Sequence, residues 1–402
     1  MGAPEIAAER LGADYFADPY SVHARLRAQR PVTPVVMPGG PGAWLITGYA
    51  EARAALADPR LSKHMPGWHP PPDSIIAALD QHMLNSDPPD HERLRKLVNK
   101  AFTARRVERL RPRITAITAG LLEDMPAHGG RRGRTEVDLL ASFAFPLPIT
   151  VICELLGIPV GDRDDFRTWS ATIVSNAAAP EVFQAHTTAM VRYFMALLAA
   201  KRREPGDDLL SALIAARDEE DSLSENELVS MAFLLLVAGH ETTVNLIASG
   251  VLALLLNPAE LARLRAEPAL IDGAVEELLR YVSPVNHTTF RCAAEPVEIG
   301  GVRISRYDPV LIALSGANRD PARFGDPDRL DLGRDSAGHL AFGHGIHYCL
   351  GAPLARLEAE IAISALLTRF GSISLAVEAA SLRWRPSTLI HGLESLPVRL
   401  AP

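Results

Sequence analysis

Apolar residues recur at helical spacing over most of the chain, and this periodicity predicts a mainly helical protein. Helices are expected throughout residues 89–257, broken only where glycine and proline cluster. Two more helices are expected at 269–281 and 350–370. An Asp-Pro pair at 18–19 indicates the start of a further helix, because aspartate caps a helix and proline suits its first position.

Shorter runs predict a small amount of β-structure. Strands are expected at 32–37 and 43–47, on either side of a glycine- and proline-rich turn, and within 295–314. Residues 61–90 lack a regular pattern and are expected to form a long, functional loop. Because no repeat, charge block or low-complexity linker divides the chain, we expect one domain over residues 1–402, mainly α with small β-sheets at its edge.

The apolar stretch at 231–256 is long enough to cross a bilayer. Its centre carries His240, Glu241 and Asn245, and groups of this kind are costly in lipid. The Ser-Glu-Asn-Glu sequence at 224–227 has the form of a capping box, as found on helices of soluble proteins. These features predict a buried central helix over 225–256 rather than a membrane span.

Composition limits the partners and the compartment. The 402 residues are 48% hydrophobic and 22% charged, which is ordinary for a globular protein, and the net charge of -7 does not indicate nucleic-acid or membrane binding. Cys153, Cys292 and Cys349 are odd in number and widely spaced, which argues against a disulfide framework. The N-terminal residues lack a secretory pattern. We therefore expect a cytoplasmic monomer.

The strongest chemical signal is the sequence Phe-Gly-His-Gly-Ile-His-Tyr-Cys-Leu-Gly at 342–351. Its glycines allow a tight loop that can approach a flat cofactor closely. Cys349 directly precedes the last long helix, whose positive N-terminal end favours a thiolate over a thiol. Two other interpretations stay open: a buried structural cysteine, and a zinc site of His344, His347 and Cys349 that would lack a fourth ligand.

A polar string, Ala-Gly-His-Glu-Thr-Thr at 238–243, interrupts the apolar central helix. The small residues Ala238 and Gly239 leave space for a flat ligand against the helix. Thr242 can donate to an upstream carbonyl and loosen the helix locally, which admits water or dioxygen, and Glu241 suits proton delivery. The alternative is a polar notch that only packs against another helix.

Glu277 and Arg280 are three residues apart and therefore share one helical face. Such a pair is common on helix surfaces, so it gains meaning only from its place before the cysteine loop. With the strings above, and with Asp-Pro-Pro-Asp-His at 87–91 and Ala-Asn-Arg-Asp-Pro at 317–321, it makes the chain resemble the cytochrome P-450 superfamily along essentially its whole length. The resemblance is closest to soluble actinomycete enzymes that hydroxylate macrolides, other polyketides or sterol-like molecules.

The resemblance implies the cytochrome P-450 fold, with haem b between the central helix and the cysteine-side helices, and Cys349 as the axial ligand of the iron. It implies that Thr242 and Glu241 serve oxygen activation and proton delivery. Glu277, Arg280 and Arg329 would form a structural core network, although the residue after Arg329 departs from the family's usual phenylalanine. The residues implied in haem binding are Ala238, Gly239, Phe342, Gly343 and Gly351, together with His91, Arg95, Arg291 and His347 for the two propionates.

The implied reaction inserts one oxygen atom from O2 into a C–H bond of a large apolar substrate. Electrons would come from NAD(P)H through a ferredoxin reductase and a ferredoxin, because no Gly-x-Gly-x-x-Gly sequence follows a strand to bind a nicotinamide or flavin cofactor. The basic residues expected to face the ferredoxin are Arg93, Lys96, Lys100, Arg105, Arg106 and Arg356. The residues implied in substrate contact are Trp68, Met83, Leu84, Val237, Val285, Asn286, Thr288, Thr289, Thr388, Leu389 and Ile390.

Other outcomes of haem-thiolate chemistry stay open on the sequence alone. Such an enzyme could epoxidise its substrate, couple carbon atoms, or act as a peroxygenase. A peroxygenase does not need the proton delivery that Glu241 and Thr242 suit. A haem-based sensor would keep Cys349 but would have no use for the acid–threonine pair, so these two residues favour a monooxygenase.

Overall fold

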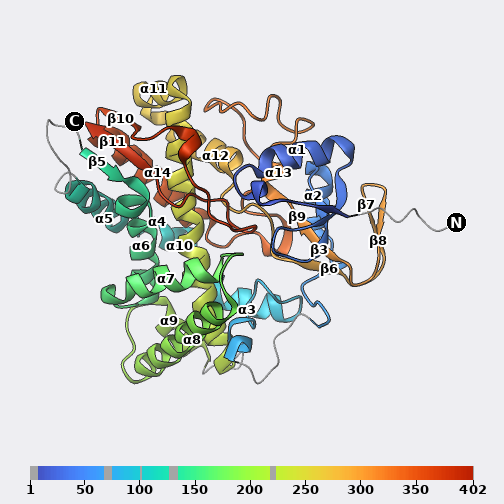
Figure 1. Cartoon of the computed structure of the whole chain (residues 1–402). Helices are drawn as coiled ribbons and strands as arrows, with labels where there is room; N and C mark the ends of the chain where they lie inside the picture. Colours follow the sequence, from blue (N-terminus) through green and yellow to red (C-terminus); the bar gives the residue numbers. More distant parts are fainter. Residues whose placement is uncertain (1–7, 68–74, 100–101, 126–134, 218–222, 402) are drawn as a thin grey trace.

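The computed structural model describes residues 8–67, 75–99, 102–125, 135–217 and 223–401. Helices fill most of the molecule, and a β-rich region that contains the N-terminal strands lies beside them (Figure 1). The mainly α fold expected from the periodicity is thus confirmed. The α-helices are α1 (Pro19–Gln29), α2 (Tyr49–Ala57), α3 (Asp90–Asn99), α4 (Ala104–Glu108), α5 (Arg111–Asp124), α6 (Pro146–Leu156), α7 (Arg163–Ile173), α8 (Pro180–Arg203), α9 (Leu209–Arg217), α10 (Glu225–Leu256), α11 (Pro258–Ala266), α12 (Ile271–Val282), α13 (Leu314–Ala317) and α14 (Ala352–Arg369).

The strands form one sheet of six and two smaller sheets. The six-stranded sheet has the order β1-β2-β3-β9-β6-β4, and the others have the orders β10-β11-β5 and β7-β8. The predicted strands at 32–37 and 43–47 are β2 and β3, which pair antiparallel across their glycine-rich turn. The bounds are β1 (Glu9–Arg10), β2 (Val32–Val36), β3 (Gly42–Ile46), β4 (Leu61–Ser62), β5 (Thr135–Asp138), β6 (Arg291–Ala293), β7 (Val297–Ile299), β8 (Val302–Ile304), β9 (Pro309–Ile312), β10 (Ser372–Leu375) and β11 (Pro397–Ala401).

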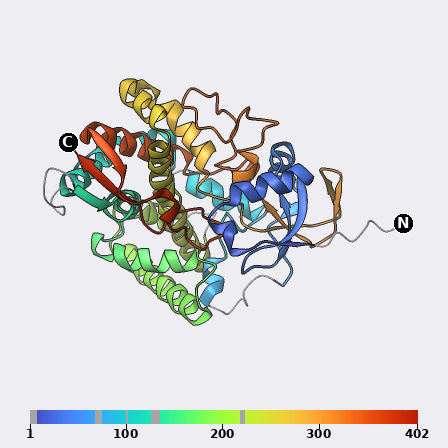
Figure 2. The same cartoon turned by 45° about the horizontal axis from the view of Figure 1, so that its top comes forward.

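The central helix α10 spans 32 residues and begins with the predicted capping box, in which Ser224 and Glu227 bond to each other's backbone amides. It contacts α6, α8, α12 and α14, and Figure 2 shows it passing between the α7–α8 pair and the α11–α12 pair. Within the described ranges α10 alone is long and apolar enough to cross a membrane, but 72% of its most apolar window is buried inside the protein. The prediction of a buried central helix is confirmed.

Apolar side chains pack against α10 on two sides and hold this helix in place. On one side Leu236 belongs to a buried cluster with Phe194 of α8, and on the other Ile247 belongs to a cluster with Leu357 of α14. Each such side chain, when fully buried, contributes about 1.5–3 kcal/mol relative to an exposed position. The helix that carries the 238–243 string is therefore rigidly held.

The segment at 61–90 is more regular than the sequence indicated. Its first residues form β4, which pairs with β6, and a short 3-10 helix covers Ile75–Leu79. The edge strand escaped prediction because two residues are too few to show alternation. Trp68 and Lys100, which the sequence placed in substrate and ferredoxin contact, lie outside the described residues.

Candidate active site

A cavity of about 430 Å³ lies between α10 and the loop that leads into α14. Its walls come from α10, from the cysteine loop at 342–351, from α3 and from the extended segment at 284–291. Residues of both chemical strings found in the sequence therefore face one space, although about a hundred positions separate them in the chain.

The cysteine loop presents the Cys349 thiol to this cavity. Gly345 has a φ of 75°, and a Cβ there would lie 2.9 Å from the Leu56 carbonyl oxygen, so both conformation and space require glycine. The Cys349 amide donates to the Phe342 carbonyl over 2.9 Å and closes the loop. Burial raises the pKa of the thiol, and backbone amides at the start of α14, those of Gly351 and Ala352, oppose this shift by donating to the sulfur.

The zinc interpretation of this loop is wrong. Within the described part of the chain, no three His, Cys, Asp or Glu side chains come together in a way that could hold a metal ion. His344 and His347 therefore do not form a metal-binding cluster with Cys349. The single thiol instead faces a cavity wide enough for a larger group.

On the opposite wall, Thr242 and Glu241 occupy the middle of α10 and both line the cavity. The Thr242 hydroxyl donates to the Ala238 carbonyl over 2.8 Å, as the helix-loosening interpretation required. Gly239 also lines the cavity, but a Cβ on it would lie 2.9 Å from Ile152 of α6. The small size of Gly239 therefore serves the close approach of α6 as well as the cavity that it lines.

The Glu241 carboxylate is held by three neighbours. Arg385 Nη1 donates to Oε2 over 2.8 Å, Ser170 Oγ donates to Oε1 over 2.8 Å, and His240 Nε2 lies 3.6 Å from Oε1. Burial alone would raise the pKa of Glu241, but the hydrogen bond from His240 and the charge of Arg385 lower it below its usual range. The depressed pKa favours the ionised carboxylate of Glu241 at neutral pH.

Arg385 was missed by the sequence analysis. It comes from the irregular segment between α14 and β11, 144 positions after Glu241, and no spacing rule links residues so far apart. Its side chain is 20% exposed, so the pair lies at the edge of the buried region. A cation was nevertheless required somewhere near Glu241, because an unpaired buried carboxylate is strongly disfavoured.

A second cluster lies at the α3 end of the cavity, where His91, Arg95, Arg291 and His347 all line the wall. The rings of His91 and His347 have centroids 4.5 Å apart. Both ring nitrogens of His91 and Nε of Arg291 are buried without a hydrogen-bond partner in the described part of the chain. Burial, together with the nearby cations, first among them Lys63, lowers the pKa of His347 to about 2.

This cluster fits a group that carries anionic oxygens. Buried polar atoms in native proteins nearly always have partners, and here several donors converge without one. Arg95 Nη2 donates to the Tyr348 carbonyl over 2.6 Å, which ties α3 to the cysteine loop. The four residues predicted to face two carboxylates are thus brought together by the fold.

The core network contains Glu277 and Arg280 as predicted, but its third member is Arg334. Glu277 and Arg280 form a fully buried pair at 2.7 and 2.8 Å, and Arg334 Nε lies 3.2 Å from Glu277 Oε1. Arg329 is wrong for this role, because its side chain is 63% exposed and pairs with Asp326 and Asp331. The turn between 326 and 334 reverses the chain and brings the later arginine inward.

Comparisons with known proteins agree with this geometry. The sequence profile of the cytochrome P450 family matches residues 182–375. The cytochrome P450 monooxygenase PikC of Streptomyces venezuelae is 52% identical over 390 residues, which cover 97% of this chain and 92% of that protein. The 6-deoxyerythronolide B hydroxylase of Saccharopolyspora erythraea is 47% identical over 404 residues, or 97% and 98% of the two chains. The chain belongs to the cytochrome P450 family.

The solved structure of the P450 monooxygenase TamI with bound tirandamycin C gives the same result. It is 51% identical, has a TM-score of 0.91, and the match covers 98% of this chain and 100% of that one. This cytochrome P450 is therefore a monooxygenase that uses haem b and O2. The cavity between Cys349 and α10, with unpartnered donors at one end, fits that cofactor.

Most residues predicted to contact substrate do line the cavity of this P450. They come from the segment before α3, from α10, from the chain after α12 and from the C-terminal region, and they are Met83, Leu84, Val237, Val285, Thr288, Thr289, Leu389 and Ile390. Sequence analysis missed His82, Phe233 and His287, which share the same wall. Nothing in their spacing marks them, since none of the three belongs to a recognisable motif.

Two of the residues predicted to contact substrate do not line the cavity. Asn286 is 2% exposed and turns away from the cavity, where its Nδ2 donates to the Tyr15 hydroxyl over 3.1 Å. Its neighbours at 285 and 287 line the cavity, so the alternation of an extended chain explains the difference. Thr388 is held outside the cavity lining, because its amide donates to Asn176 Oδ1 over 2.7 Å.

Proposed function

We propose that this P450 hydroxylates a large apolar molecule of the polyketide, macrolide or sterol-like type, with Cys349 as the axial iron ligand. The observation that carries the proposal is one cavity with the Cys349 thiol on one wall and Thr242 of α10 on the other. Apolar side chains such as Leu84, Val237 and Ile390 line the same space. The names of two relatives support the substrate class, since one acts on 6-deoxyerythronolide B and another binds tirandamycin C.

In this proposal different parts of the cavity wall have different functions. The amides of Gly351 and Ala352 stabilise the Cys349 thiolate, and His91, Arg95, Arg291 and His347 hold the haem propionates. When bound, haem b supplies O2 activation and insertion of one oxygen atom into a C–H bond. The apolar wall orients the substrate by shape and excludes water from the reacting C–H bond.

Proton delivery to the oxygen end of the cavity falls to α10. The Thr242 hydroxyl bonds to the Ala238 carbonyl and can accept a proton from one side while donating on the other. Glu241 accepts hydrogen bonds from Arg385 and Ser170, so it orders the hydrogen-bonded path beside Thr242 as an ionised acceptor rather than as a stored acid. Opening of the Arg385 contact would let the carboxylate turn toward Thr242.

The CO complex of the reduced protein tests the ligand. Wild type should absorb at the wavelength diagnostic of thiolate ligation, and Cys349→Ala should lose that band. Cys292→Ala is the matched control, because its thiol is buried and donates to the His64 carbonyl instead. A Cys349→Ala protein that kept the thiolate spectrum would exclude the assignment. A screen of polyketides and sterols for a low-spin to high-spin Soret shift then tests the substrate class.

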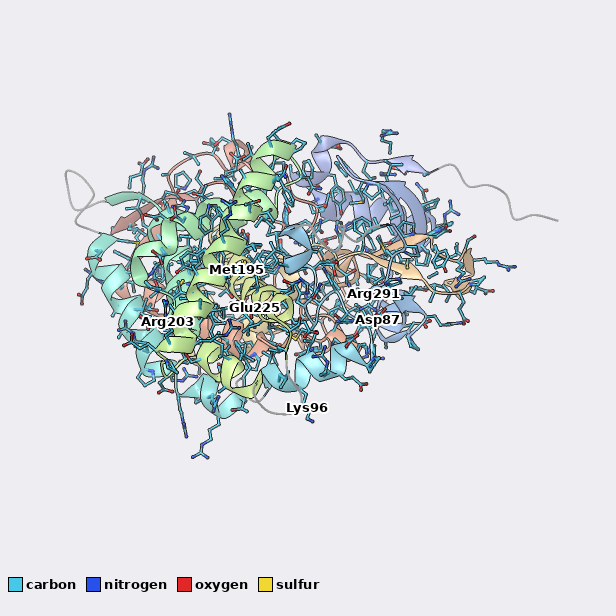
Figure 3. All side chains as sticks on the ribbon, turned by 90° about the horizontal axis from the view of Figure 1, so that it is seen from below. Asp87, Lys96, Met195, Arg203, Glu225 and Arg291 are labelled. Atoms are coloured by element: carbon cyan, nitrogen blue, oxygen red, sulfur yellow. The ribbon has the colours of Figure 1, made fainter. Side chains whose placement is uncertain are left out.

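Electrons are proposed to come from NAD(P)H through a ferredoxin reductase and a ferredoxin that docks on exposed basic residues beside the cysteine loop. Lys96 of α3 and Arg105 and Arg106 of α4 are exposed, and Figure 3 shows Lys96 projecting from the molecule. Arg356 and Arg93, expected in the same role, are each neutralised by an ion pair, with Glu276 and Glu227 respectively. They contribute less charge to docking than the sequence indicated.

Charge reversal tests this surface. Lys96→Glu with Arg106→Glu should slow ferredoxin-driven reduction at low salt, because electrostatic steering acts on the association rate and is screened over about 10 Å at 0.1 M salt. Arg303→Glu, an exposed residue of β8, is the control with the same change of sign. Equal rates for all three proteins across a salt series would place the docking site elsewhere.

A further inference from the structure

Lys63 is a buried lysine at the α3 end of the cavity. It follows β4, is 6% exposed and lines the same cavity as Arg95, Arg291 and His347. Its Nζ donates to Thr289 Oγ1 over 2.5 Å and lies 3.3 and 3.2 Å from the carbonyl oxygens of residues 289 and 290. Lysine is rarely buried to this extent without a paired anion.

The nearest acid, Asp87, is used for other contacts. Its carboxylate accepts from the Lys63 backbone amide over 3.0 Å and from the Ser62 hydroxyl over 2.5 Å. It therefore fixes the backbone of the lysine, and within the described ranges no carboxylate oxygen lies within 4.0 Å of Nζ. Figure 3 shows Asp87 beside Arg291, which places this acid among the cations of the cavity wall.

The charges around this end of the cavity do not balance within the protein. With anionic groups bound beside them, Lys63, Arg95 and Arg291 would supply three positive charges, and Asp87 supplies one negative charge. Burial and the Arg291 guanidinium hold the pKa of Lys63 well below its ordinary value, and burial lowers the pKa of Arg291 as well. The excess of two positive charges equals the charge of two propionates.

We infer that Lys63 is a further haem-binding residue, which supplies the third cation of the group that neutralises the propionates. The inference rests on the haem placement proposed above, in which this end of the cavity receives both carboxylates. It adds a residue directly after β4 that no motif marks, because the lysine stands alone in an irregular segment. The three oxygens around Nζ aim the ammonium, and Asp87 holds the backbone from which it extends.

Haem retention and the iron potential test the inference without any need for a substrate. Lys63→Met should speed haem transfer from the ferric holoprotein to an excess of apomyoglobin by roughly tenfold, because loss of one partner of a buried charge pair acts on dissociation. The same variant should have a lower reduction potential, since a nearby positive charge favours the electron-rich state of the iron. Lys63→Arg should restore most of both values.

Two controls separate charge from packing. Lys96→Met removes the same ammonium from an exposed position of α3 and should leave haem loss and potential at wild-type values. Haem dimethyl ester lacks the propionate charges, so wild type and Lys63→Met reconstituted with it should lose the cofactor at equal rates. A difference that persisted with the ester would overturn the inference. If Lys63→Met does not accumulate as holoprotein, the same measurements are made on Lys63→Gln.

The remaining outcomes distinguish this inference from the proposed haem placement. If Arg95→Met speeds haem loss and Lys63→Met does not, the lysine is outside the propionate group and the placement stands. If neither variant changes haem loss, the placement itself is wrong. The carboxylate of a substrate is the other anion that the Lys63 ammonium could bind. Unchanged haem loss and potential in Lys63→Met, with loss of a Soret shift induced by myristic acid, would assign the ammonium to substrate instead.

Discussion

Arg385 Nη1 donates to Glu241 Oε2 over 2.8 Å and thereby joins the C-terminal segment to the middle of α10. The contact brings a cation from outside the helix to a carboxylate that is only 6% exposed. It lowers the pKa of Glu241 together with His240, so the acid faces the cavity in its charged form. The C-terminal segment thus holds the Glu241 side chain through Arg385 and also lines the cavity through Leu389 and Ile390.

Removal of Arg385 alone should destabilise the protein more than removal of Arg385 together with the charge of Glu241. Arg385→Met leaves a buried charge without its cation, which should cost about 3 kcal/mol of unfolding free energy. The double variant Arg385→Met, Glu241→Gln should recover much of that loss, because no buried charge remains. Arg383→Met, at an exposed position two residues away, should stay within about 0.5 kcal/mol of wild type. Urea unfolding of these four proteins and of the single variant Glu241→Gln completes the cycle, and purely additive effects would show that the two residues are uncoupled.

Thr242→Ala should uncouple electron consumption from product formation. The hydroxyl lines the cavity and is fixed by its bond to the Ala238 carbonyl, so its loss removes a proton relay without opening the fold. We expect an unchanged Soret shift with a bound substrate, a several-fold lower yield of product per NADPH, and a matching rise in peroxide. Thr243→Ala is the control, since Thr243 bonds to the next carbonyl of the same helix, that of Gly239. A product yield equal to wild type would remove Thr242 from proton delivery.

Much of this architecture could be read from the sequence, and the failures share one cause. The cysteine loop and the polar string of α10 are local patterns, and the fold places them on facing walls as expected. Arg385, Lys63 and Arg334 were missed because each reaches its partner through a turn or an irregular segment. Periodicity describes regular elements, and it does not determine where a long side chain on a loop will end.

The stability of the protein in acid should depend on Glu276 of α12. Burial would raise the pKa of Glu276, but hydrogen bonds from Arg356 and His339 lower it to about 2, from an ordinary value of 4.5. A carboxyl whose folded pKa is depressed stabilises the fold above its unfolded pKa. That contribution is therefore lost as the pH falls from about 4.5 toward 2.

Glu276→Gln isolates this contribution. The side chain is 32% exposed, so solvent screening reduces the expected loss at neutral pH to roughly 1–2 kcal/mol. Wild type and variant should differ by a constant amount above about pH 5 and converge progressively as the pH falls from about 4.5 toward 2, as measured by urea unfolding at each pH. For Glu298→Gln, at an exposed position of β7, the curve of unfolding free energy against pH should stay parallel to that of wild type throughout. If the curve for Glu276→Gln also stayed parallel to that of wild type, the depressed pKa of Glu276 would be contradicted.

The arginine that completes the Glu277 network can be identified by a pair of matched variants. Glu277 is fully buried and accepts from Arg280, from Arg334 Nε at 3.2 Å and from the Ser336 hydroxyl, so it needs more than one positive neighbour. Arg334→Met should cost about 3 kcal/mol, because it leaves this carboxylate short of a charged donor in a buried site. Arg329→Met should cost no more than about 0.5 kcal/mol, because an exposed pair is worth little in water. If urea unfolding instead shows the larger loss for Arg329→Met, the turn at 326–334 must place the earlier arginine inward, and the network predicted from the motif spacing would be restored.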